Sequence, residues 1–198
     1  MGQQSEKRGP EIYIVSGLPR SGTSMAMRML EAGGIEACTD RQRQADADNP
    51  KGYFEYEAVK QLKSDTSWVA QAQGKALKVI SQLLGALPAG LTYRVVFMQR
   101  SLDEVLRSQA AMLLRRGLVA PSAAEDEQIK TLFTRHLLEV EAWLQRQENM
   151  QCLFVPHGGV LQEPSVWAER INRFAGGGLD SQAMAAVVDP DLYRQRQP

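Results

Sequence analysis

Short apolar runs alternate along the chain with longer stretches in which apolar residues recur every three or four positions. The apolar runs predict buried strands at 12–15, 75–80, 93–98 and 152–155. The periodic stretches predict helices at 22–32, 56–68, 101–116, 124–147, 163–174 and 181–188. Strands that alternate with helices predict an α/β fold of three layers, with a mostly parallel sheet between two layers of helices.

Several local signals place the ends of these elements. Gly33 and Gly34 end the first helix, and the spacing of Ser101 and Glu104 predicts a capping box at the start of another. The polar stretch 41–52 predicts a loop. The helix at 124–147 is expected to bury one broad apolar face, made of Ile129, Leu132, Phe133, His136, Leu137, Val140 and Leu144.

Length and composition limit the classes of protein that this chain can represent. Its 198 residues predict a single domain over 11–198 after a flexible polar lead-in over 1–10. The formal net charge of zero gives no reason to expect nucleic acid or an anionic membrane as partner. We expect a cytoplasmic location, because there is neither a long apolar segment nor a signal-peptide core. Two cysteines and two histidines predict no metal site.

The segment GLPRSGTS, residues 17–24, carries the clearest functional signal. It lies between the first predicted strand and the first predicted helix, which is the layout of a phosphate-binding loop. Its spacing nearly fits the Walker A pattern, but Thr23 stands at the lysine position and Arg20 is the only cation. The loop therefore predicts an anion site without the lysine that reaches the outer phosphates of a nucleoside triphosphate.

The strand at 93–98 gives a second indication. Enzymes that hydrolyse Mg²⁺-nucleotides place a metal-binding Asp after a buried strand, whereas this strand leads to Arg100. A guanidinium suits a terminal phosphate, because its donors form a planar fork. A nucleotide kinase or NTPase remains the alternative enzyme class, and a nucleotide-binding protein without chemistry is the alternative outside enzymes.

The loop resembles the 5′-phosphosulfate-binding loop of the sulfotransferases in all six residues from Pro19 to Ser24. These enzymes transfer a sulfuryl group from 3′-phosphoadenosine 5′-phosphosulfate (PAPS), without a metal, on a fold like that of the P-loop NTPases. The resemblance implies nucleotide contacts from Pro19, Arg20, Ser21, Gly22, Thr23 and Ser24. It also implies a catalytic role for Arg20 at the bridging oxygen, where negative charge develops during transfer.

A second signature of the same family supports this resemblance. Arg100 and Ser108 are eight residues apart, as are the arginine and serine that bind the 3′-phosphate in sulfotransferases. Arg194 and Arg196 resemble the basic tails that approach that phosphate. The chain is most similar to small bacterial sulfotransferase-like proteins with GLPRSGTS and NPKGYFE segments. At 155–161 it lacks the family's usual acidic residues, and two glycines there predict a loosened turn.

The general base follows from the same resemblance. Carbohydrate and several bacterial sulfotransferases use a Glu some tens of residues after the loop, which implies Glu55, with Glu57 and Asp48 as alternatives. His136 and His157 are less well placed for this role. The expected acceptor is a small molecule or carbohydrate with a hydroxyl or an amine. So short a chain leaves open a homo-oligomer in which a second copy completes the acceptor cleft.

Overall fold

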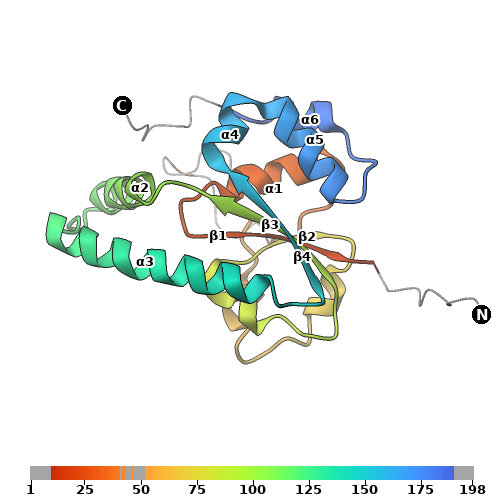
Figure 1. Ribbon diagram of the computed structural model, residues 1–198, viewed down its shortest axis with the longest axis horizontal. Helices are drawn as coiled ribbons and strands as arrows, with labels where there is room; N and C mark the ends of the chain where they lie inside the picture. The colour runs from red at the N-terminus through yellow and green to blue at the C-terminus, as the bar shows by residue number, and fades with distance from the viewer. Residues whose placement is uncertain (1–9, 41, 43–45, 47–51, 190–198) are drawn as a thin grey trace, which may run out of the picture.

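The computed structural model describes residues 10–40, 42, 46 and 52–189. Its centre is a four-stranded sheet in the order β2-β1-β3-β4 (Figure 1). The strands are β1 (Ile12–Gly17), β2 (Ala76–Lys78), β3 (Tyr93–Gln99) and β4 (Met150–Pro156). All neighbouring pairs are parallel, so every strand ends at the same edge of the sheet. The α/β class and the four predicted strands are confirmed.

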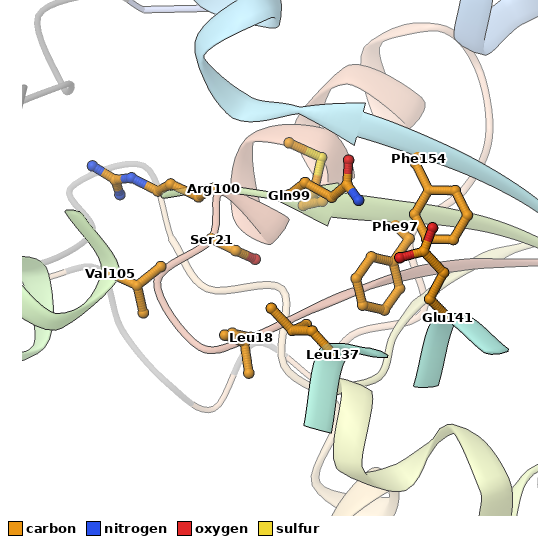
Figure 2. Close-up of a pocket in the computed structure, with 10 residues that line it drawn as sticks. Leu18, Ser21, Phe97, Gln99, Arg100, Val105, Leu137, Glu141 and Phe154 are labelled. Atoms are coloured by element: carbon orange, nitrogen blue, oxygen red, sulfur yellow. The ribbon is translucent and has the colours of Figure 1, made fainter. Parts of the chain in front are cut away.

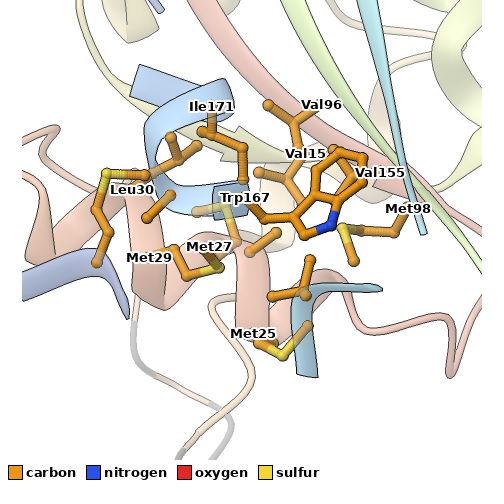
Figure 3. Close-up of a cluster of buried hydrophobic side chains, with 14 of the residues drawn as sticks. Val15, Met25, Met27, Met29, Leu30, Val96, Met98, Val155, Trp167 and Ile171 are labelled. Carbon is orange, nitrogen blue, oxygen red and sulfur yellow. The ribbon is translucent and has the colours of Figure 1, made fainter. Parts of the chain in front are cut away.

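Helices cover both faces of the sheet, which confirms the three layers. One face packs against α1 (Thr23–Ala32), α5 (Pro164–Phe174) and α6 (Ser181–Ala186). Figure 3 shows how the methionines of α1 and Trp167 of α5 meet the strands there. The opposite face packs against α3 (Ala123–Leu144) and the short 3₁₀ helices η1 (Glu57–Gln61), η2 (Val69–Ala72) and η3 (Ser81–Ala86).

The segment 56–68 is not the single helix that its pattern predicted. Only η1 is helical there, and turns follow it until η2 begins. Polar side chains explain the interruption, because the Ser64 hydroxyl donates to the carbonyl of Gln61 and the amide of Ser67 donates to Asp65. Such local bonds compete with the hydrogen bonds of a continuing helix.

Helix α3 buries much less than predicted. Leu144 is its only buried residue, whereas Leu132 of the predicted face is 54% exposed. Figure 1 gives the reason: α2 (Leu102–Arg115) and the first half of α3 project together beyond the edge of the sheet. The apolar pattern was correct in period, but half of the helix has no sheet to cover.

Two further corrections concern the ends of helices. Ser101 precedes α2 but makes no side-chain capping bond, and the capping box lies instead between Ser122 and Glu125 at the start of α3. The stretch that two glycines were expected to loosen forms a short helix, α4 (His157–Gln162). There Gly159 lies so close to Trp167 that a Cβ would stand 2.8 Å from the indole nitrogen. The lack of a side chain at Gly159 permits this contact between α4 and α5.

The core on the α1 face is expected to dominate stability. Leu30 of α1 is 1% exposed, so Leu30→Ala should lower the free energy of unfolding by about 3 kcal/mol through lost burial and a new cavity. Leu132→Ala is the matched control on exposed α3 and should change it by less than about 0.5 kcal/mol. Urea denaturation of both variants measures the difference, and equal effects would contradict this assignment of the core.

Candidate functional site

The loop between β1 and α1 needs both glycines of its motif. Gly17 has a φ of 143° and lies beside β3, where a Cβ would stand 2.7 Å from the carbonyl oxygen of Met98. Gly22 has a φ of 102° and is the N-cap of α1, where a Cβ would stand 2.5 Å from Cδ2 of His157. Positive φ and close neighbours together favour glycine at both positions.

Arg20 connects the two predicted signatures. Its backbone has a φ of 73°, which is uncommon for a residue with a side chain. Its Nε donates a hydrogen bond of 2.9 Å to the hydroxyl of Ser108 on α2. The structure therefore brings together residues that are 88 positions apart in sequence.

Arg100 holds the same loop from the end of β3. Its Nη1 donates to the carbonyl oxygen of Arg20 at 2.9 Å, and its Nε is 2.9 Å from the Glu104 carboxylate. The side chains of this ion pair are only 9% and 6% exposed. Glu104, which the sequence predicted as the partner of Ser101 in a capping box, instead orients the guanidinium of Arg100.

The remaining loop residues differ in where their side chains lie. The carbonyl of Pro19 accepts from the Gln109 side chain at 3.5 Å, which adds a contact with α2. The Ser24 hydroxyl donates to the carbonyl of Tyr53 at 3.5 Å. Ser21 is only 2% exposed, and its hydroxyl has no hydrogen-bond partner in the described part of the chain. Thr23 begins α1, where the backbone N–H groups of the first turn favour an anion.

Glu55 lies near this loop through a short series of contacts. Tyr53 is buried, and its carbonyl accepts hydrogen bonds from Ser24 and from Lys78 at the end of β2. The Glu55 carboxylate is 31% exposed and 3.7 Å from the Lys78 ammonium. Its backbone carbonyl accepts from the Thr39 hydroxyl at 2.8 Å. The segment that carries Glu55 is thus fixed at the edge where the strands end.

The alternative bases and the tail arginines are placed differently. Glu57 pairs with Lys60 at 2.7 Å, and both side chains are more than half exposed. Asp48, Arg194 and Arg196 lie outside the described residues.

Sequence reasoning missed two residues of this site. Lys78 ends a strand that was predicted, so the rule that ligands bind at the carboxyl ends of strands would have drawn attention to it. His157 was set aside, yet its ring lies against Gly22 and is 8% exposed. His136, by contrast, is half-buried on α3, with Nε2 2.9 Å from the Ser81 hydroxyl.

The surroundings of His157 disfavour its protonated form. Burial is the largest cause and the positive charge of Arg100 the second, while Glu104 acts in the opposite direction. Together they lower the pKa of His157 to about 4. The imidazole beside the loop is therefore neutral at neutral pH.

Among the described residues, no group of three or more His, Cys, Asp or Glu side chains could hold a metal ion. No helix among those residues is long and apolar enough to cross a membrane.

Comparison with solved structures decides the fold. Over 98% of its length the chain matches 83% of the sulfotransferase domain of the Synechococcus PCC 7002 olefin synthase, with a TM-score of 0.55 and 16% identity. The fold is that of the sulfotransferases. Sulfotransferase STF1 of Mycobacterium tuberculosis H37Rv matches at a TM-score of 0.60 and 17% identity, covering 90% of this chain and 70% of that one.

A mammalian structure matches over a similar share of the chain. Mouse sulfotransferase SULT7A1, solved in complex with PAP, has a TM-score of 0.54 and 16% identity, with coverage of 91% of this chain and 63% of the mouse chain. No family model and no curated protein matches the sequence. At these identities the sulfotransferase-like fold is shared although most side chains differ.

The lowered pKa of His157 makes stability depend on pH. Between about pH 6.5 and about pH 4 the unfolded chain binds a proton that folded His157 does not, so the free energy of unfolding falls as the pH falls. The loss should approach about 3 kcal/mol by pH 4 and be absent above about pH 6.5. Urea denaturation at several pH values in this range measures the free energy of unfolding. That free energy should depend less steeply on pH in His157→Gln than in the unchanged protein. Parallel curves would contradict the prediction.

Proposed function

We propose that this protein is a PAPS-dependent sulfotransferase that transfers a sulfuryl group to a hydroxyl or amine of a small-molecule or carbohydrate acceptor. The observation that carries this proposal is the contact between its two signatures, in which Arg20 bonds to Ser108 and Arg100 bonds to the Arg20 backbone. Two motifs recognised separately in the sequence meet at the ends of β1 and β3, where an open α/β sheet binds ligands.

The residues present fit a nucleotide with phosphates at two positions. The loop and the first turn of α1 supply backbone N–H groups for the 5′-phosphosulfate, and Arg20 supplies the cation beside it. Arg100 and Ser108 supply donors for the 3′-phosphate. Glu104 fixes the direction of the Arg100 guanidinium before the nucleotide arrives, which reduces the side-chain entropy lost on binding.

The chemistry requires a base for the acceptor. PAPS supplies the sulfuryl group: the acceptor oxygen or nitrogen bonds to sulfur, the bond from sulfur to the bridging phosphate oxygen breaks, and 3′,5′-adenosine bisphosphate leaves. Glu55 takes the acceptor proton in this proposal. Lys78, whose ammonium is 3.7 Å away, pairs with this carboxylate and orients it. Arg20 stabilises the negative charge that develops on the leaving phosphate.

The alternative is a P-loop nucleotide kinase or NTPase, and two residues count against it. Thr23 occupies the position of the phosphate-binding lysine, and Arg100 follows the strand at which such enzymes carry a metal-binding Asp. The second alternative is a protein that binds the nucleotide but has lost transfer. Binding and transfer experiments separate the three.

The first experiment is calorimetric titration with 3′,5′-adenosine bisphosphate, compared with Mg²⁺-ATP and AMP. We expect the bisphosphate to bind most tightly and without dependence on Mg²⁺. Arg20→Ala should lower the affinity for the bisphosphate by at least about tenfold, because a charge-assisted hydrogen bond is lost. The double variant Arg100→Gln/Glu104→Gln should do the same without leaving a buried charge unpaired.

Arg135→Ala is the matched control for these titrations. Its guanidinium lies on α3, 72% exposed and 3.7 Å from Glu139, so its removal should change the affinity by less than about twofold. Preference for Mg²⁺-ATP would refute the sulfotransferase proposal in favour of the kinase or NTPase.

The second experiment tests the base. With ³⁵S-labelled PAPS and a panel of alcohols, sugars and amines, Glu55→Gln should lower the transfer rate by at least about a hundredfold while changing bisphosphate affinity by less than about threefold. Glu57→Gln is the control two positions away and should retain the rate. Equal rates for Glu55→Gln and the unchanged protein would eliminate Glu55 as base. Bisphosphate binding without transfer to any acceptor would favour the binding protein.

A further inference from the structure

A cavity of about 190 Å³ lies between the phosphate-binding loop, the end of β3 and helix α3 (Figure 2). Its walls are largely apolar and come from five parts of the fold: Leu18, Phe97, Val105, Leu137 and Phe154. The rings of Phe97 and Phe154 are tilted against each other, with centroids 5.6 Å apart, and form an aromatic side. An apolar cavity of roughly 150 Å³ is large enough for benzene, so this one has room for a ring with a short substituent.

The cavity is reachable from solvent. Gln99, the last residue of β3, is exposed and lines it, as do the half-buried residues Leu137 and Glu141 of α3. The route to the surface therefore passes between the end of β3 and α3.

Ser21 is a polar group in the lining of the cavity. Ser21 is 2% exposed, its hydroxyl has no hydrogen-bond partner in the described residues, and Figure 2 shows it turned into the space between the loop and α3. A buried hydroxyl left without a partner costs free energy, which a bound polar group or water would recover. A ligand that fills the cavity from the α3 side would reach this hydroxyl.

Glu141 gives the cavity its charge. Its carboxylate lines the cavity one turn after Leu137, and within the described residues it takes part in no ion pair or side-chain hydrogen bond. Arg100, which also lines the cavity, already pairs with Glu104. Burial, and secondly the negative charge of Glu141, raise the pKa of nearby Cys152 to about 12. The Glu141 carboxylate thus places a negative charge on the lining, whereas the positive charge of Arg100 is already balanced by Glu104.

We propose that this cavity is a second binding site, which takes a small molecule made of an apolar ring and a protonated amine. The ring packs between the two phenylalanines and Leu137, and the ammonium pairs with the Glu141 carboxylate. A cation is favoured over a neutral or anionic group of the same shape, because a half-buried carboxylate without a counter-ion gains most from one.

The test uses three probes of the same size: benzylamine, benzyl alcohol and benzoate. Each is titrated into the full-length protein while the backbone amide signals of Leu18, Ser21, Leu137 and Glu141 are followed by NMR. We expect benzylamine to bind at least about tenfold more tightly than benzoate, with benzyl alcohol between them. Shifts confined to those amides would place the probe in the cavity.

Two variants and one control complete the test. Glu141→Gln should lower the affinity for benzylamine by about tenfold and change the affinity for benzyl alcohol by less than about twofold. The preference for the cation then disappears. Leu137→Trp fills the cavity and should abolish binding of all three probes. Glu127→Gln, an exposed acid on the same helix, should change nothing.

Three results would overturn the proposal. They are no benzylamine binding to folded protein at millimolar probe, equal affinity for benzylamine and benzoate, and unchanged binding in both Glu141→Gln and Leu137→Trp. The titrations contain no nucleotide, so failure here leaves the proposed sulfotransferase function to be judged by bisphosphate binding alone.

Discussion

The site depends on the hydrogen bond from Arg100 to the backbone carbonyl of Arg20. It fixes the end of β3 to the middle of a loop whose backbone adopts a left-handed conformation at a residue with a long side chain. Such a conformation persists only where its surroundings determine it. The Arg100 guanidinium can do this because the buried Glu104 carboxylate holds its other side.

We expect the ion pair of Arg100 and Glu104 to position the guanidinium and the loop more than to stabilise the fold. Removing two charges from water costs free energy that their attraction only partly returns, whereas deleting one partner leaves the other uncompensated. The pair therefore makes the loop intolerant of single changes at either residue. The Glu104 carboxylate also lowers the net positive charge around Arg100 while it keeps the guanidinium donors aligned.

The same loop separates two different environments. On one side, Gly22 lies against the neutral imidazole of His157, and Arg20 bonds to Ser108 of α2. On the other side, Leu18 and Ser21 line a mostly apolar cavity that ends at the carboxylate of Glu141. This segment of eight residues thus presents the guanidinium of Arg20 on one side and contributes Leu18 and Ser21 to the cavity wall on the other.

The sequence by itself determined the alternation of strands and helices, the loop after the first strand, and the positions of Arg100 after a strand and Ser108 on the following helix. These features are local, because the period of apolar residues, the spacing of glycines and short motifs all involve residues that are close together in the sequence. Only the tertiary structure decided that Glu104 pairs with Arg100, that His157 packs on Gly22, that Lys78 faces Glu55, and that half of α3 lies beyond the sheet. Each of these depends on which strand ends are neighbours and on how far a helix extends past them. Those are distances in space between residues far apart in the chain, and no local pattern encodes them.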